Sequence, residues 1–207
     1  MTTVVFDGKI LAADTLAVYT HDESDRFCLT CNTCTEEVGS DFSKIHLYDG
    51  KVTYKEQVVI ATACLGSAIV SKALDKSLEL GQLNEETLEI VFRFLRKRNE
   101  VCDGTLAIWT HESFWVVRVI DGKYTETQVT EFPWEGGSGG YAAMTTIKYM
   151  GLNATDAVAI AADIDYHSGG PVESVVNVNG VYTLTKTEYT SSQMDHFKLR
   201  HPLGVKA

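Results

Sequence analysis

The chain opens with Thr2-Thr3-Val4-Val5-Phe6-Asp7-Gly8-Lys9-Ile10-Leu11-Ala12-Ala13-Asp14, in which two apolar runs flank an Asp-Gly dipeptide. Runs of β-branched and aliphatic residues are typical of strands. Asp-Gly favours the type I′ turn that joins two antiparallel strands. We therefore expect a β-hairpin with strands at 4–6 and 9–13.

Beyond this hairpin, the sequence alternates between strand patterns and pairs of helix patterns. Strands are predicted at 44–48 and 51–54 around an Asp-Gly turn, and at 58–63, 104–110, 113–120, 123–130, 172–178 and 181–187. Helices are predicted at 67–80, at 85–98 behind Asn84 as N-cap, from the glycine cluster 136–140 to 150, and from Asn153 or Thr155 to 165. This order indicates two antiparallel sheets packed face to face, each covered by a helix pair, an α+β fold with four layers.

Composition narrows the class of protein. With 207 residues and 44% apolar content, we expect one domain over 1–207, whose last residues, about 188–207, form a C-terminal arm. The net charge of −10 argues against a nucleic-acid partner. No apolar run is long enough to span a membrane, and the first residues lack the features of a signal peptide. We therefore expect a cytoplasmic protein, and five cysteines, an odd number, argue against a disulfide framework.

Cys28, Cys31 and Cys34 lie at a spacing of three in a polar stretch, 20–41. One interpretation is a zinc site with His21 or His46 as the fourth ligand. Zinc sites are more usually built from two separate Cys-x-x-Cys pairs, whereas here the pairs overlap. The spacing therefore favours an ordinary loop or strand over a metal site, and we predict no metal and no cofactor.

Thr2 directly follows the initiator methionine. A threonine hydroxyl is a weak nucleophile and needs a base, which the amine of an N-terminal threonine supplies because its pKa is about 8. Removal of Met1 would create such a residue without a propeptide. A Met-Thr start is common, so this feature alone predicts little.

Five separated segments, taken together, resemble proteasome β subunits and the peptidase of the bacterial two-component ATP-dependent protease. They are 2–5 with 10–15, Ser43-Lys44-Ile45-His46-Leu47, Cys64-Leu65-Gly66-Ser67-Ala68, Gly137-Ser138-Gly139-Gly140, and Asp165-Tyr166-His167-Ser168-Gly169-Gly170 before Pro171-Val172. The resemblance covers about residues 2–185. It implies the four-layer αββα sandwich of N-terminal-nucleophile hydrolases.

The resemblance also implies a role for each matching residue. The predicted catalytic residues are Thr2 as nucleophile, Asp14 and Lys44 as the charged pair, Gly66 as oxyanion donor, and Ser138, Asp165 and Ser168 around the N-terminal amine. Outside such a site, each residue type has an ordinary structural explanation. Their order and their fit to the element pattern favour the functional interpretation.

The function implied is a threonine endopeptidase that hydrolyses polypeptides inside a homo-oligomeric, self-compartmentalised ring, usually with an ATPase unfoldase as partner. One alternative is a proteasome-like structural or assembly protein without catalysis, which a geometry that keeps Asp14 from Lys44 would favour. Another is a stand-alone N-terminal-nucleophile amidase.

Two lengths depart from the family pattern. The hairpin between Thr2 and Asp14 is about four residues shorter than usual, an even number that keeps each side chain on its face of the sheet. The stretch from Lys44 to Gly66 is about eight residues longer, which suggests an extended hairpin.

Overall fold

The computed structural model describes residues 2–21, 35–39, 42–97, 103–165, 168–190 and 193. Its first sheet, here the β1 sheet, has five strands in the order β11 (Trp134–Gly137), β1 (Thr3–Phe6), β2 (Leu11–Asp14), β12 (Val172–Val178) and β13 (Val181–Thr187). The second, the β7 sheet, has the order β10 (Lys123–Val129), β9 (Phe114–Ile120), β8 (Gly104–Thr110), β7 (Gln57–Gly66) and β5 (Ile45–Leu47), with β6 (Thr53–Tyr54) paired to β7. All these pairings are antiparallel.

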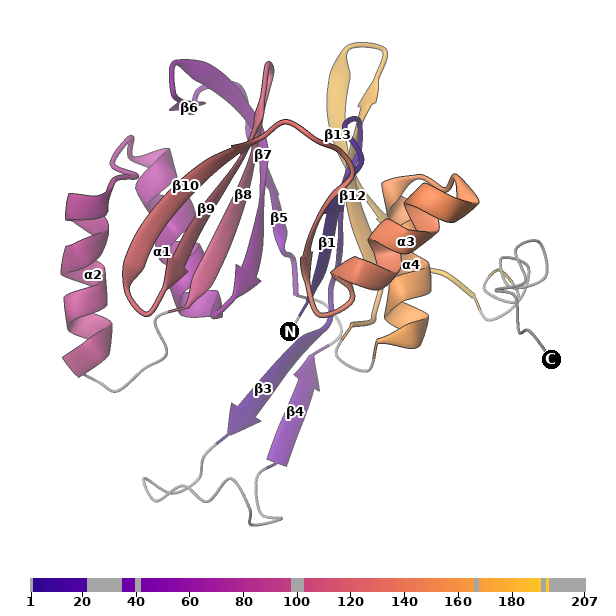
Figure 1. Ribbon diagram of the computed structural model, residues 1–207, viewed down its shortest axis with the longest axis horizontal. Helices are drawn as coiled ribbons and strands as arrows, with labels where there is room; N and C mark the ends of the chain where they lie inside the picture. Colours follow the sequence, from indigo (N-terminus) through magenta and orange to yellow (C-terminus); the bar gives the residue numbers. More distant parts are fainter. Residues whose placement is uncertain are drawn as a thin grey trace.

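Two helix pairs cover the outer faces of these sheets (Figure 1). Helices α1 (Ala68–Glu79) and α2 (Glu85–Lys97) lie on the β7 sheet, and α3 (Gly140–Met150) and α4 (Ala154–Ile164) lie on the β1 sheet. A hairpin of β3 (Ala17–His21) and β4 (Thr35–Gly39) extends away from the layers. The four-layer α+β architecture is thereby confirmed. No helix in the described part of the chain is long and apolar enough to cross a membrane.

Three buried apolar clusters fill the three interfaces between the four layers. The cluster between the sheets includes Phe6 and Leu11 from one sheet and Trp109 and Phe114 from the other. A second cluster joins α1 and α2 to the β7 sheet, and a third, rich in alanine, joins α3 and α4 to the β1 sheet. The small side chains of the third cluster let α4 lie close to β1 and β2, the strands that bear the N-terminal threonines and Asp14.

Asn84 and Asn153 cap their helices as predicted. The Asn84 side chain accepts a hydrogen bond from the Thr87 amide at 2.9 Å, and that of Asn153 accepts one from the Asp156 amide at 3.0 Å. Each bond satisfies an amide that has no partner within the helix.

The predicted type I′ turn at Asp7-Gly8 is wrong. The last strand pair is Phe6 opposite Leu11, so the loop has four residues, and Asp7 does not adopt the positive φ that a type I′ turn needs. The Asp7 carboxylate instead accepts hydrogen bonds from the amides of Lys9 and Ile10, and from that of Ala154 at the start of α4. These three bonds hold the wider loop and tie it to the helical layer.

The predicted hairpin between 44–48 and 51–54 is also wrong, because both segments pair with β7 rather than with each other. The tight turn lies at Lys55-Glu56, where both residues have positive φ and join Tyr54 to Gln57. This β6–β7 hairpin accounts for the extra length between Lys44 and Gly66.

Two further differences concern the ends of predicted elements. Gly136 and Gly137 belong to β11, a strand that was not predicted, and α3 begins only at Gly140. At the start of the expected C-terminal arm, the Tyr189 hydroxyl donates to the Asp156 carboxylate at 2.9 Å. Residues 191, 192 and 194–207 lie outside the described residues.

Packing between the two sheets predicts a large loss of stability for Phe114→Ala. The Phe114 ring is buried and stacks on the Phe6 ring with centroids 4.4 Å apart. Its removal should lower the free energy of unfolding by about 3–5 kcal/mol, measured by urea denaturation. The control Ile120→Ala changes an exposed side chain on the same strand and should stay within about 0.5 kcal/mol. Equal losses in the two variants would contradict this account of the core.

Candidate active site

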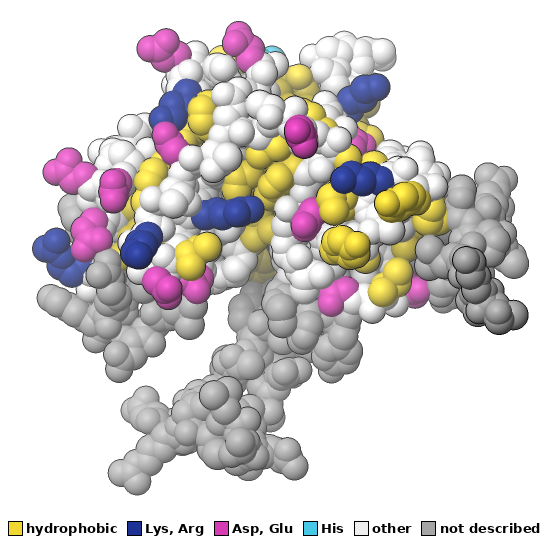
Figure 2. Space-filling model, viewed as in Figure 1, with side chains coloured by type: hydrophobic (Ala, Val, Ile, Leu, Met, Phe, Trp, Pro, Cys, Tyr) yellow, Lys and Arg dark blue, Asp and Glu magenta, His cyan; other side chains and the backbone are white. Residues whose placement is uncertain are grey.

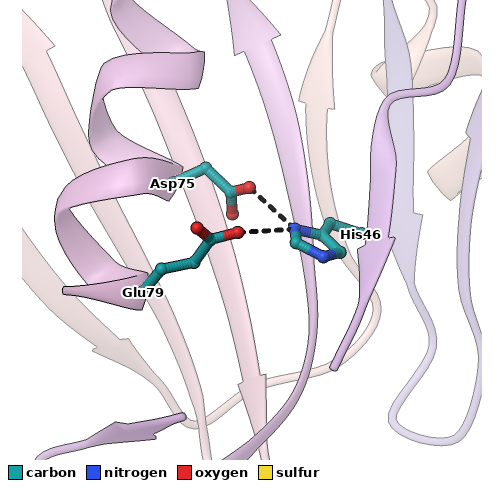
Figure 3. A group of neighbouring side chains, drawn as sticks. All are labelled: His46, Asp75 and Glu79. Atoms are coloured by element: carbon teal, nitrogen blue, oxygen red, sulfur yellow. Dashed lines mark hydrogen bonds and ion pairs between the residues drawn. The ribbon is translucent and has the colours of Figure 1, made fainter. Parts of the chain in front are cut away.

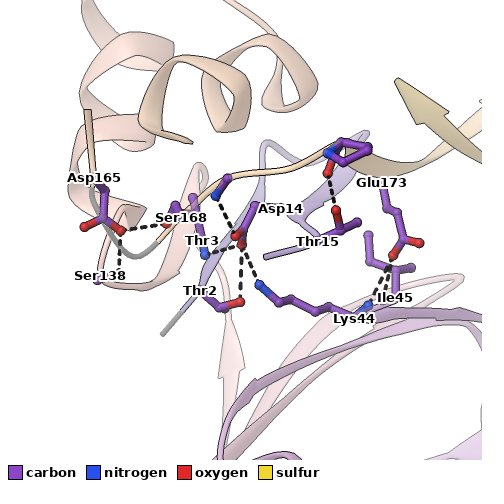
Figure 4. A network of polar contacts seen from close by, with 12 residues as sticks. Thr2, Thr3, Asp14, Thr15, Lys44, Ile45, Ser138, Asp165, Ser168 and Glu173 are labelled. Carbon is purple, nitrogen blue, oxygen red and sulfur yellow. Dashed lines mark hydrogen bonds and ion pairs between the residues drawn. The ribbon is translucent and has the colours of Figure 1, made fainter. Parts of the chain in front are cut away.

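The Asp14 carboxylate, at the end of β2, is completely buried and collects four hydrogen-bond donors (Figure 4). Its Oδ1 accepts from Thr2 Oγ1 at 3.2 Å, from the Thr3 amide at 2.7 Å and from Lys44 Nζ at 2.9 Å. Its Oδ2 accepts from the Gly169 amide at 3.1 Å. The predicted nucleophile and the predicted lysine therefore contact the same carboxylate oxygen.

Strand register brings these groups together. Val4 lies opposite Ala13 in the β1–β2 hairpin, so Thr3 comes level with Asp14 and Thr2 lies just beyond the last pair. On the other side of β2, Asp14 lies opposite Val172, two residues after the chain passes Gly170. The short hairpin thus still brings Asp14 within reach of Lys44.

Lys44 lies just before β5 and is almost completely buried, with 6% of its side chain exposed. Burial lowers the pKa of the Lys44 ammonium, because removal from water disfavours its charged form. The negative charges of Asp14 and Glu173, with the hydrogen bond to Asp14, oppose this shift. The ammonium group is thereby paired in the interior but is less basic than an exposed lysine.

Glu173 is a buried carboxylate that the sequence analysis did not single out. It lies on β12, and its Oε2 accepts from the Lys44 amide at 3.1 Å and from Ser43 Oγ at 3.1 Å. It therefore joins the β1 sheet to the chain that enters β5. The sequence offered one signal for Glu173, which is a charged residue within the predicted strand 172–178. Charged residues are rarely buried without a partner, so its position there indicates a specific contact.

A second group of hydroxyls and a carboxylate continues the network. Asp165 Oδ2 accepts from Ser138 Oγ at 2.5 Å and from Ser168 Oγ at 2.6 Å. Ser168 Oγ also lies 2.6 Å from Thr3 Oγ1. Since the Thr3 amide donates to Asp14, Thr3 connects the two groups, a role that the sequence analysis missed. Six of the seven predicted site residues thus belong to one network.

Two glycines of the 136–140 cluster allow the N-terminal strand to approach. A Cβ atom at Gly137, which has a φ of +89°, would lie 1.7 Å from the Thr2 carbonyl oxygen. A Cβ atom at Gly139 would lie 2.1 Å from Thr3 Oγ1 and 3.0 Å from Ser168 Oγ. Any side chain at either position would displace the residues of the site, which explains why glycine occupies both positions.

Gly66 ends β7 directly before Ser67, the N-cap of α1, and has a φ of +79°. Two residues earlier, the Cys64 amide donates to the Lys44 carbonyl oxygen at 2.9 Å. No side-chain hydrogen bond described for the chain links Gly66 to the Asp14 network. The structure therefore does not bring Gly66 into the network, and its role as oxyanion donor remains a prediction.

The cysteine motif, Cys28, Cys31 and Cys34, falls outside the described residues. His46, considered as a zinc ligand with them, instead contacts Asp75 on α1.

Comparison with known proteins supports this architecture. No family model and no curated protein matches the chain. Among solved structures, a Gly-1 mutant of Anbu from Hyphomicrobium sp. strain MC1 matches with a TM-score of 0.55 and 13% identity. The match covers 97% of this chain and 96% of that one.

The chain shares the four-layer α+β fold of Anbu. At 13% identity the match to Anbu shows the fold alone.

The buried Lys44–Asp14 pair predicts that Lys44→Met is strongly destabilising. Methionine fills much of the same volume but leaves the Asp14 carboxylate in the interior without a positive partner. The expected loss is about 3–5 kcal/mol in the free energy of unfolding, measured by urea denaturation at pH 7.

The double variant Lys44→Met/Asp14→Asn is the informative control. It removes both charges, so it should recover part of the loss although it carries one more substitution. A double variant that is less stable than Lys44→Met alone would contradict the unpaired-charge explanation.

Proposed function

We propose that this protein is a threonine-type peptidase that hydrolyses polypeptides with Thr2 Oγ1 as its nucleophile, after removal of Met1. One observation carries the proposal: Thr2 Oγ1 and Lys44 Nζ both bond to Oδ1 of the buried Asp14. A lone threonine at the start of a strand would not need a buried lysine–aspartate pair at its hydroxyl.

In the first step, the free amine of Thr2 takes the proton of Thr2 Oγ1, and the oxygen attacks the scissile carbonyl carbon. The amine suits this role because its reference pKa of about 8 lies near neutral pH. A tetrahedral oxyanion forms, and the backbone N–H of Gly66 is the proposed donor to it. Such a donor lowers the barrier by on the order of 3 kcal/mol in other hydrolases.

The charged pair acts on the nucleophile electrostatically. The Lys44 ammonium favours the ionised form of the Thr2 hydroxyl, and Asp14 keeps that ammonium charged and oriented. Glu173 acts one step further away, because it holds the Lys44 backbone and its negative charge raises the Lys44 pKa. We therefore infer that Glu173 is a positioning residue.

The hydroxyl network serves the amine. Ser138, Asp165 and Ser168 lie in a hydrogen-bonded chain that reaches Thr3, the residue next to the proposed base. We propose that this chain positions the amine and the water through which its proton moves. The ammonium then protonates the leaving amine, the peptide bond breaks, and a water molecule hydrolyses the resulting acyl ester and frees Thr2 Oγ1.

Assembly into a homo-oligomeric ring is the second part of the proposal. Hydrophobic side chains gather on the outer face over α3 and α4 (Figure 2), and Tyr141, Tyr149 and Ile164 are exposed there. Exposed apolar patches of this kind mark protein–protein interfaces. An ATPase unfoldase that feeds the ring rests on the sequence resemblance alone.

The alternatives differ in what they predict. A proteasome-like scaffold without catalysis would not react at Thr2, and a stand-alone amidase would be monomeric in solution. The contact of Asp14 with Lys44 favours the peptidase over the scaffold, because a scaffold has no need of that pair beside Thr2.

The proposal predicts covalent labelling at Thr2. Intact mass of the purified full chain should show loss of one methionine, and a peptidyl epoxyketone should add one adduct per chain. Thr2→Ala should abolish the adduct because it lacks the oxygen nucleophile. Thr2→Ser should retain it, and so should Thr53→Ala, which changes a threonine on β6.

A retained methionine in protein made by its own host, or a free Thr2 that never labels, would contradict the peptidase and favour the scaffold. A chain that labels but remains monomeric by solution mass would retain the nucleophile and favour the amidase over the ring.

The buried Lys44 predicts the alkaline limb of the pH profile. Labelling needs the charged form of Lys44, so its rate should fall as the pH is raised. Because burial lowers the pKa of Lys44, this fall should come at a pH below 10.5, the ordinary lysine pKa. Glu173 opposes that shift, so Glu173→Gln should move the limb to lower pH. The control Glu112→Gln removes one exposed charge from the β8–β9 turn and should leave the limb in place. An unmoved limb in Glu173→Gln would contradict the positioning role.

A further inference from the structure

His46, Asp75 and Glu79 form a compact group between β5 and α1 (Figure 3). His46 belongs to β5, while Asp75 and Glu79 lie one turn apart on α1 and point toward it. His46 Nδ1 lies 2.9 Å from Asp75 Oδ2 and 3.6 Å from Glu79 Oε1. One ligating atom from each residue lies within 4.8 Å of the others.

Neighbouring groups hold these side chains in place. Asp75 Oδ1 accepts from the Tyr48 hydroxyl at 2.7 Å and from Thr62 Oγ1 at 2.6 Å, which leaves Oδ2 directed at His46. The Tyr48 ring also stacks on the imidazole, with centroids 4.2 Å apart. Ligands of metal ions are typically oriented by such outer hydrogen bonds. The arrangement therefore resembles a prepared site more than a chance surface ion pair.

In each of the two carboxylates, one oxygen has another partner and the second oxygen faces His46, where a cation would bind. Glu79 Oε2 is paired with Lys76, whereas Oε1 faces His46 Nδ1. One imidazole nitrogen and two carboxylate oxygens are a donor set that suits divalent first-row transition metals such as Zn²⁺ or Mn²⁺. Three protein ligands would leave the remaining positions to water.

We propose that His46, Asp75 and Glu79 bind a divalent transition-metal cation that links β5 to α1. The group is partly exposed, so an ion can enter from solvent. This site is separate from the proposed peptidase site, and its test needs no catalytic activity.

The competing explanation is a set of hydrogen bonds between His46 and the two carboxylates without a metal. The two explanations differ in whether the chain binds a divalent cation in a fixed ratio, and in whether that binding depends on His46 and Glu79.

The test uses metal-stripped, tag-free full-length protein titrated with Co²⁺, followed by its visible absorption and by calorimetry. Nitrogen and oxygen ligands give weak ligand-field bands, whereas cysteine ligands add intense thiolate charge-transfer bands. We expect one Co²⁺ per chain without the charge-transfer bands, and its displacement by Zn²⁺. Bound Zn²⁺ should also raise the melting temperature, because it binds the folded state alone.

His46→Gln and Glu79→Gln should each weaken binding at least tenfold and remove the rise in melting temperature. Glu79 is the better carboxylate to change, because Asp75 also holds Tyr48 and Thr62 and its loss affects folding. His111→Gln, an exposed histidine on the β8–β9 turn, is the matched control and should bind as the unchanged chain does. Absence of stoichiometric binding, or binding that survives both His46→Gln and Glu79→Gln, would overturn the proposal.

Discussion

The buried charge of Asp14 is the constraint to which the rest of the site conforms. A carboxylate removed from water loses several kcal/mol of solvation free energy, and hydrogen-bond donors from the protein must compensate for that loss. Here four donors do so, and they come from the N-terminal residues, from the chain before β5 and from the segment after Ser168. Segments far apart in the sequence must therefore reach the same end of the β1 sheet, which places strict demands on how the layers pack.

The layers meet these demands with small residues. Alanines in β2 and α4 bring the helical layer close to the strand that bears Asp14, and the glycines before α3 let the chain cross the N-terminal residues. Bulky aromatic residues fill the space between the sheets instead, as Phe6 and Phe114 show. The polar network thus lies where small residues let the backbone segments approach one another closely.

The sequence predicted the layers and six members of the network because both leave local or ordered patterns. Helix caps, alternating strands and the separated motifs were sufficient for that. Strand pairing was less predictable: 44–48 and 51–54 both pair with β7, since β7 offers a long apolar edge and Lys55-Glu56 adopts positive φ without a glycine. Thr3 and Glu173 were missed because their roles depend on contacts between distant segments, which no single motif records.

The position of Lys44 depends on a weak element. β5 has three residues and lies at the edge of its sheet, so its pairing with β7 alone holds it loosely. Glu173 holds the chain entering β5 from the β1 sheet, and Asp75 contacts His46 and Tyr48 from α1. The carboxylates of Glu173 and Asp75, which come from the layers on either side, thus hold β5 in a position that its own backbone hydrogen bonds would not maintain. Because His46 comes two residues after Lys44, whatever tightens β5 against α1 also restricts where the Lys44 ammonium can lie relative to Asp14.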